Sequence, residues 1–180
     1  MPRHVAFLRG INVGGHRVSR DELRSCFEGM GFREVATFRA SGNVIFEADR
    51  EAPAMMAARI ERALAKTLGY GVPAFVRTAS EIRAITRHQP FATGLVEASA
   101  GKLQVAFFST KPATKRWKEL QDLATDEDKL AIEGRELYWL PSGGILDSAL
   151  DMAAIEKALG SMTMRTKNTV DQIAAKHFSD

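Results

Sequence analysis

The chain has 180 residues, of which 45% are hydrophobic and 26% are charged, with 25 Lys and Arg against 22 Asp and Glu. This composition excludes a disordered, collagenous or disulfide-stapled chain, and no apolar run approaches the roughly 18 residues that a membrane span requires. Acidic residues are interleaved with the basic ones, so the net charge of +3 does not indicate a DNA-binding stripe. The single cysteine, Cys26, fits a reducing compartment, and we expect a cytoplasmic protein that does not contact membranes.

The first half of the chain, residues 1–90, predicts strands and helices in the order βαββαβ, followed by a helix. The expected elements are a strand at 4–8, a helix capped by Ser19 and Glu22, strands at 35–39 and 44–47, a helix opened by Pro53 and closed by Gly69, a strand at 72–77, and a short helix capped by Thr78 and Glu81. Each helix boundary rests on residues that satisfy the unpaired backbone groups of a helix end.

Residues 91–101 form the expected connector, because the stretch 88–101 shows no periodic pattern. The second half, residues 102–180, is expected to hold a strand at 103–108, a helix begun by Pro112, a hairpin of 129–132 and 136–140, a helix near 148–159 stopped by Gly160, and a last helix from about 169 to 177. The two halves share an order of elements without obvious sequence repetition.

The βαββαβ order is typical of the ferredoxin-like split motif, an antiparallel sheet with helices on one face. The first strand of each half, at 4–8 and at 103–108, is apolar on both sides, so something must cover the open face of each sheet. We therefore predict an α+β fold of two ferredoxin-like halves packed together, in a protein that is a monomer or a homodimer.

Three motifs resemble a known family. They are AFLRGINVGG at 6–15, ASGNVIFE at 40–47 and TMRTKNTV at 163–170, and they look like the bacterial family called domain of unknown function 1697. The resemblance implies an α+β fold related to the ferredoxin-like type and no agreed activity. The positions that match the family's motifs are Arg9, Gly10, Asn12, Gly14, Gly15, Ser41, Gly42, Asn43, Arg165, Asn168 and Thr169.

The chain departs from the family pattern at two places. The family tail usually reads Arg-Asn-Trp-Asn-Thr, whereas Thr166 and Lys167 replace the Asn-Trp pair here. The family also tends to carry Ser-Lys-Leu where this chain has Ala149 between Ser148 and Leu150. Where such positions touch a ligand, this chain would bind it differently or not at all.

The glycine-rich loop has the spacing G-x-x-x-x-G between Gly10 and Gly15, but a nucleotide-binding P-loop needs a Lys and a Ser or Thr next, where His16 and Arg17 stand. Consecutive glycines can still point backbone N–H groups into one concavity that holds an anion. Arg9 and Arg165 could add charge-assisted hydrogen bonds. The alternative is that the glycines only allow a tight turn.

The ligand that we expect is small and anionic or phosphate-bearing. Short polar side chains in the turns could either stabilise those turns or donate to this ligand, and Asn168 is expected to cap the last helix. The candidate ligand-binding residues are Arg9, Asn12, Gly14, Gly15, His16, Ser41, Asn43 and Arg165.

Two other functions stay open. A ferredoxin-like sheet can bind single-stranded nucleic acid through exposed aromatic side chains, although the strand aromatics Phe7, Phe38, Phe46, Phe75, Phe107 and Phe108 are expected to be buried. An enzyme could use His16 as a general base with Ser41 or Ser142. The histidines lack metal-ligand spacing, so we expect no metal and no cofactor, and Cys26 should be a buried thiol.

Overall fold

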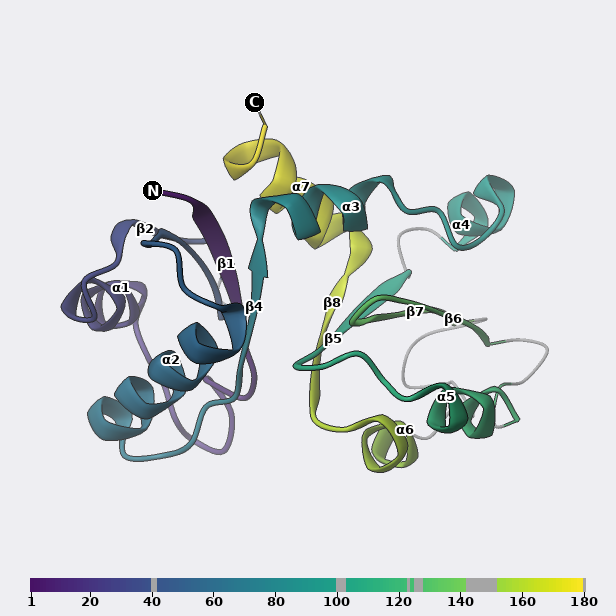
Figure 1. The fold of residues 1–180 in the computed structure, drawn as a ribbon, viewed down its shortest axis with the longest axis horizontal. Helices are drawn as coiled ribbons and strands as arrows, with labels where there is room; N and C mark the ends of the chain where they lie inside the picture. The colour runs from purple at the N-terminus through teal and green to yellow at the C-terminus, as the bar shows by residue number, and fades with distance from the viewer. Residues whose placement is uncertain (40–41, 100–102, 123, 125–127, 142–151, 180) are drawn as a thin grey trace. The chain divides into compact units, whose positions relative to one another are not determined.

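The computed structural model of the chain describes residues 1–39, 42–99, 103–122, 124, 128–141 and 152–179 (Figure 1). The chain divides into two compact units, one formed by Met1–Ile85 with Ile173–Asp180 and the other by Thr86–Gln172. Each unit contains a four-stranded antiparallel sheet. Within the described residues, no helix has both the length and the apolar run that crossing a bilayer requires.

The first unit has the ferredoxin-like topology. Its elements begin with β1 (Arg3–Leu8), α1 (Arg20–Gly29), β2 (Arg33–Thr37), β3 (Asn43–Glu47), α2 (Pro53–Leu68), β4 (Ala74–Thr78) and α3 (Ala79–Arg87). The strand order is β2-β3-β1-β4, and all neighbours are antiparallel. This arrangement is the one that the βαββαβ order predicts.

The predicted helix boundaries of this unit are confirmed. Ser19 and Glu22 form a reciprocal capping box at the start of α1, with a hydrogen bond of 2.7 Å from the Ser19 backbone N–H to the Glu22 carboxylate. Pro53 is the first residue of α2, and Gly69 ends that helix in the left-handed conformation with φ of 80°. Local sequence therefore determines where these helices begin and end.

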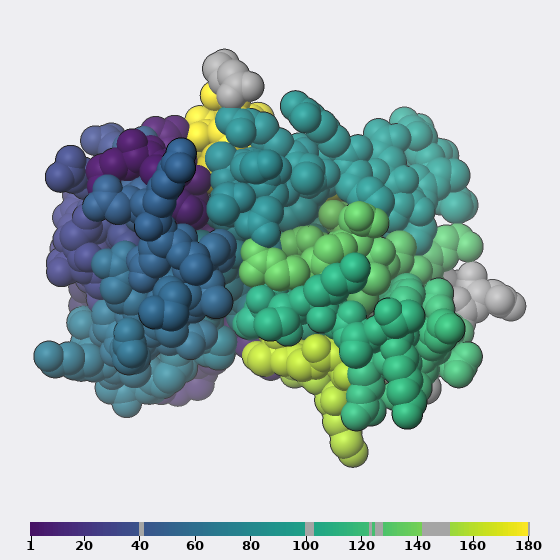
Figure 2. Space-filling view, viewed as in Figure 1, coloured from purple at the N-terminus to yellow at the C-terminus, as the bar shows by residue number. Residues whose placement is uncertain are grey.

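Helices α1 and α2 cover one face of the first sheet (Figure 1). The buried core beneath them contains Ala6, Leu8, Leu23, Phe27, Val44, Phe46, Met56, Ile60, Leu64, Ala74 and Val76. Each large side chain that is fully buried there contributes about 1.5–3 kcal/mol of hydrophobic free energy. The opposite side of α2 is exposed, as its blue surface in Figure 2 and the 62% exposure of Met55 show.

The second unit repeats the topology of the first. Its elements are α4 (Thr93–Ala98), β5 (Gln104–Phe108), α5 (Thr114–Gln121), β6 (Lys129–Glu133), β7 (Glu136–Leu140), α6 (Met152–Leu159) and β8 (Met162–Thr166). Helix α7 (Lys167–His177) begins in this unit, and its residues from Ile173 on belong to the first unit. The strand order β6-β7-β5-β8 is again 2-3-1-4 within the unit, and all neighbours are antiparallel. Helices α5 and α6 supply Leu120 and Ile155 to the core on one face of this sheet (Figure 1).

Strands β1 and β5 are buried along both faces, which explains why their sequences are apolar without alternation. Val5 and Phe7, which point away from α1 and α2, are both fully buried. Val105 and Phe107 are fully buried in the same way.

Strand β8 was not expected from the sequence. Its residues Met162–Arg165 alternate between apolar and polar, but the strand is only five residues long, and it is defined by its pairing with β5 from Phe108↔Met162 to Gln104↔Thr166. The stretch 88–101, expected to be irregular, contains the short helix α4, which begins with hydrogen bonds to the Ala92 carbonyl and has no side-chain cap. The sequence did not predict this helix because Ala92, which precedes it, has no side chain that can cap a helix.

The expectation that Asn168 caps the last helix is wrong. Helix α7 begins at Lys167, and the Thr166 hydroxyl accepts a hydrogen bond of 3.1 Å from the Thr169 backbone N–H. Asn168 is exposed within the first turn. Thr166, one of the departures from the family pattern, is therefore the capping residue. Ala149, the other departure, and the expected helical start near 148 lie outside the described residues.

Candidate functional site

The loop between β1 and α1 contains three glycines with positive φ, at Gly10 (68°), Gly14 (62°) and Gly15 (83°). A Cβ atom at Gly14 or Gly15 would meet no other atom within 4 Å. Glycine is favoured at these two positions because of the backbone conformation, and not because a neighbouring atom lies too close for a side chain.

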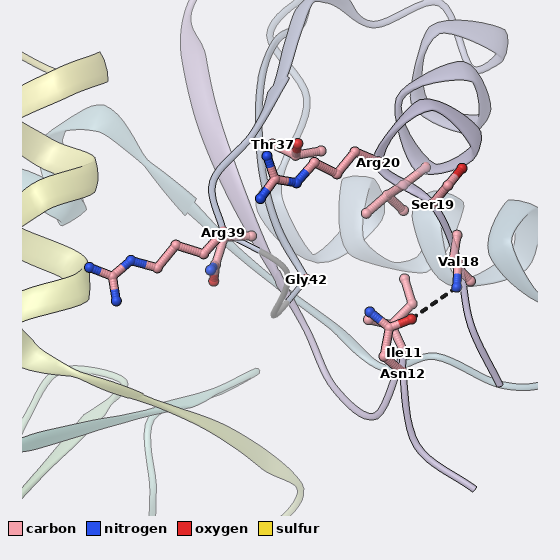
Figure 3. Close-up of a pocket in the computed structure, with 10 residues that line it drawn as sticks. Ile11, Asn12, Val18, Ser19, Arg20, Thr37, Arg39 and Gly42 are labelled. Carbon is pink, nitrogen blue, oxygen red and sulfur yellow. Dashed lines mark hydrogen bonds between the residues drawn. The ribbon is translucent and has the colours of Figure 1, made fainter. Parts of the chain in front are cut away.

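Tyr70 and side chains of the loop itself hold this loop in place. The Tyr70 hydroxyl donates a 2.7 Å hydrogen bond to the Ile11 carbonyl, and the ring of His16 stacks on the Tyr70 ring with centroids 3.8 Å apart. The Asn12 side-chain oxygen accepts a 2.9 Å hydrogen bond from the Val18 backbone N–H (Figure 3). These contacts preorganise the loop before any ligand arrives.

A small cavity of about 50 Å³ lies beside the loop. Its walls come from the loop, from the start of α1 and from the turn between β2 and β3. The polar side chains that line it are Asn12, Ser19, Arg20, Thr37, Arg39 and Asn43. Two arginines and no Asp or Glu are among the described residues of this lining, so the cavity favours negative charge.

The two arginines come from different elements. Arg20 is the first residue of α1, and its guanidinium lies toward Thr37 (Figure 3). Arg39 has a φ of 58°, and its side chain extends away from Asn12, with the guanidinium carbon 5.5 Å from the centre of the Phe38 ring (Figure 3). A positive φ at a non-glycine residue is uncommon and is concentrated at functional sites.

Glu22, an acidic residue in the first turn of α1, serves the helix cap. Glu22 accepts the backbone N–H of Ser19 at 2.7 Å, and the hydrogen bonds from Ser19 lower the pKa of the Glu22 carboxyl. Glu22 is thus held ionised at the capping box.

Two of the predicted ligand-binding residues line the cavity, Asn12 and Asn43. Asn43 is 1% exposed and donates a 2.9 Å hydrogen bond to the Phe38 carbonyl, so it also stabilises the turn between β2 and β3. Four predicted residues are described but do not line this cavity, namely Arg9, Gly14, Gly15 and His16. Ser41 lies outside the described residues.

Arg165 belongs to the second unit, where it lies in β8 opposite Val105. Its guanidinium donates hydrogen bonds to the Thr163 hydroxyl at 2.9 Å and to the Met164 carbonyl at 2.8 Å. Burial lowers the pKa of Arg165 to about 10, so the side chain still carries its charge at neutral pH. The pairing of Arg165 with the glycine-rich loop stays a prediction.

The sequence reasoning missed Arg20 and Arg39, although a signal was present. Arg20 directly follows the predicted cap Ser19, and Arg39 directly precedes the ASGN turn. Arg20 thus adjoins a predicted helix cap and Arg39 a predicted turn, and arginine binds phosphate and carboxylate groups through two parallel hydrogen bonds.

The described residues give less support to other chemistry. Among them, no group of three or more His, Cys, Asp and Glu side chains is arranged to hold a metal ion. Cys26 is half-buried, which corrects the expectation of a buried thiol, and its Sγ lies 3.7 Å from the Thr67 hydroxyl oxygen. Both serines considered as nucleophiles, Ser41 and Ser142, lie outside the described residues.

The strand aromatics are mostly unavailable for stacking on bases. The rings that are at most 2% exposed are Phe7, Phe46, Phe75, Phe107 and Phe108. Phe38 is half-buried and follows the end of β2. A base-stacking platform on a sheet face requires exposed rings, so these strands do not offer one.

Comparison with known proteins identifies a family and a fold. The family model described as a protein of unknown function (DUF1697) matches residues 1–138. The chain is similar to the conserved bacterial protein SP0830 from Streptococcus pneumoniae, whose structure superposes with a TM-score of 0.73, at 18% sequence identity and with 98% of each chain covered. No curated protein matches the chain. The match over residues 1–138, which include the glycine-rich loop and the ASGN turn, shows that the chain belongs to the DUF1697 family.

Proposed function

We propose that the protein binds a small anionic or phosphate-bearing ligand through the cavity beside the glycine-rich loop. The observation that carries this proposal is Arg20, in a lining that has no carboxylate among its described residues. Arg39 also lines the cavity, but its guanidinium extends away from Asn12 (Figure 3). Charge-assisted hydrogen bonds from guanidinium groups to phosphate oxygens are about twice as strong as neutral ones.

The polar groups around the arginines support an anionic ligand. The Asn12 amide oxygen accepts the Val18 backbone N–H, so this lining side chain is held in place within the loop (Figure 3). Thr37 and Ser19 add hydroxyl groups to the lining. The Arg20 guanidinium and these hydroxyl groups are donors of the kind that recognise a phosphate or carboxylate group.

The size of the cavity limits what enters it. A single water needs roughly 10–15 Å³ of such volume, so about 50 Å³ holds one phosphate-sized group and not a whole nucleotide. The rest of the ligand would lie over the exposed loop, where Val13 is 60% exposed.

The other two functions have weaker support. Binding of single-stranded nucleic acid would rest on backbone phosphates alone, because the strand aromatics other than Phe38 are buried. For an enzyme, the candidate base His16 is stacked on Tyr70, and we propose no reaction. A cytoplasmic location, and a monomer or a homodimer, remain predictions from the sequence.

Thermal unfolding at low salt tests the proposal with a panel of inorganic phosphate, pyrophosphate, nucleotides, sugar phosphates and short single-stranded RNA. A ligand at roughly 100 times its Kd adds about 2.7 kcal/mol, which raises the Tm by about 5–10 °C for a chain of this size. We expect a shift with at least one small phosphate compound. A shift with RNA alone, which fades steeply with salt, would favour the nucleic-acid function, and no shift with any compound would contradict both.

A further inference from the structure

A second and larger cavity, of about 240 Å³, lies within the unit Thr86–Gln172. It is lined by the end of α3 and the segment that follows it, by α4 (teal in Figure 2), by Leu103 just before β5, and by Lys167 and Asp171 of α7. The residues used below are His88, Phe91, Val96, Leu103, Lys167 and Asp171. None of them belongs to the site proposed above, so this inference stands or falls independently of that function.

The polar part of the cavity is an ion pair. Lys167 Nζ lies 2.6 Å from Asp171 Oδ1 and donates a 3.2 Å hydrogen bond to the Thr86 carbonyl. An ammonium group has three N–H donors, and two of those of Lys167 have partners among the described residues. Asp171 uses one carboxylate oxygen for Lys167, and its side chain is 44% exposed. The pair therefore presents a donor beside an acceptor.

The remaining walls are apolar or aromatic. Leu103 is buried, whereas Phe91 and Val96 are half-buried at the rim of the cavity. The His88 ring packs against the Tyr138 ring, with centroids 4.9 Å apart, which fixes the orientation of the imidazole. A flat ring fits between such walls better than a flexible chain, because aromatic and aliphatic surfaces favour stacking.

The charge of the lining disfavours an anion. Lys167 is offset by Asp171, and Glu97 adds a further carboxylate to the same lining. The Lys, Asp and Glu side chains of the lining therefore carry no positive excess. This cavity thus differs from the arginine-lined one in the charge of the ligand that it can take.

We propose that this cavity binds a small neutral heterocycle that carries a lactam edge, a carbonyl next to a ring N–H. The carbonyl of such a ring accepts from Lys167, its N–H donates to Asp171, and its faces lie against Phe91 and Val96. Oxo-substituted purines and pyrimidines have this edge, and hypoxanthine and uracil are the simplest probes. Benzoate has the ring with a negative charge, and indole has a ring N–H without the carbonyl, so each serves as a chemical control.

The test is titration of the isotope-labelled full chain with each probe, followed by two-dimensional amide NMR. We expect hypoxanthine or uracil to shift the amide signals of residues 88–97 and 167–171, and Lys167→Met to weaken this binding by about tenfold. Lys115→Met removes an exposed lysine of α5 in the same unit and should leave binding unchanged. Phe91→Ala, which keeps the ion pair, should also weaken it.

The proposal would be overturned by no localised shift with either lactam at millimolar concentration, by equal binding of benzoate, or by binding that survives Lys167→Met in a folded variant. If Lys167→Met does not fold, the shifts of the unmodified chain and of Phe91→Ala still decide the matter. Indole binding at the strength of uracil would also contradict it, because the carbonyl would then contribute nothing.

Discussion

Arg77 and Arg165 occupy the same position in the two sheets. Arg77 of β4 lies opposite Val5 of β1, and its guanidinium donates a 3.0 Å hydrogen bond to the carbonyl of the preceding residue. Arg165 of β8 lies opposite Val105 of β5 and donates to the carbonyl of the preceding residue at 2.8 Å. The two units thus repeat a side-chain interaction as well as a topology.

The equivalence extends to the residue that follows each arginine. Thr78 accepts a 3.2 Å hydrogen bond from the Glu81 backbone N–H, and Thr166 accepts one of 3.1 Å from the Thr169 backbone N–H. Each threonine is the last residue of a strand and directly precedes a helix. In the sequence, the repeat is visible only as short identical segments, Arg-Thr and Val-Ala-Phe, in the two halves. These segments are too short to reveal the repeat without the strand register.

The Thr166 cap of α7 gives a first prediction, about stability. Thr166→Ala should lower the free energy of unfolding by about 1 kcal/mol, because the first turn of α7 loses a hydrogen-bond acceptor. Asn168→Ala, two residues on and exposed, should change it by less than about 0.5 kcal/mol. Urea unfolding of the two variants measures both values. A larger loss for Asn168→Ala than for Thr166→Ala would contradict the assignment of the cap.

Much of the fold could be predicted because the signals are local. The Ser19 and Glu22 box, the glycine after α2 and the Gly134 turn each specify a boundary within a few residues. Strand β8 could not be predicted in this way, since its five residues become a strand through pairing with β5, more than fifty positions away in the chain. The candidate site was harder to predict than the fold, because Asn12, Arg20 and Arg39 come from separate segments of the chain that only the fold brings to one cavity.

Two histidines, the buried His4 and the half-buried His177, predict a loss of stability in acid. Burial lowers the pKa of His4 from 6.5, and burial, with Lys176 and Arg3 nearby, lowers that of His177. His4 Nδ1 and His177 Nε2 have no hydrogen-bond partner among the described residues. The unfolded chain binds these protons more readily, so stability is complete above about pH 6.5 and falls as the pH drops below it.

Urea unfolding from about pH 7.5 to about pH 5 tests this dependence. His4→Gln is a matched variant, because Gln104 holds the equivalent position of the second unit, opposite Thr166 as His4 is opposite Thr78. It should fold and show a smaller decrease in acid. A pH dependence that is unchanged in both His4→Gln and His177→Gln would show that other groups cause it.

Two glycines beside the site should differ in their tolerance of substitution. Gly42 has a φ of 74°, and a Cβ there would lie 3.1 Å from the Leu8 carbonyl oxygen and from Ile11 Cγ2. Gly42→Ala should therefore cost about 2–3 kcal/mol, from backbone strain and from crowding. Gly14→Ala has a similar φ in open space and should cost about 1 kcal/mol. Thermal unfolding ranks them, and equal costs would mean that the turn adjusts freely around Gly42.

Calorimetric titration of pyrophosphate at low salt, into the unmodified chain and two arginine variants, tests the central claim most directly. Arg20→Gln removes a guanidinium of the cavity, whereas Arg24→Gln removes an exposed one from the next turn of α1. The account predicts measurable binding that weakens by about tenfold in Arg20→Gln and hardly changes in Arg24→Gln. No binding to the unmodified chain, or equal weakening in both variants, would contradict it.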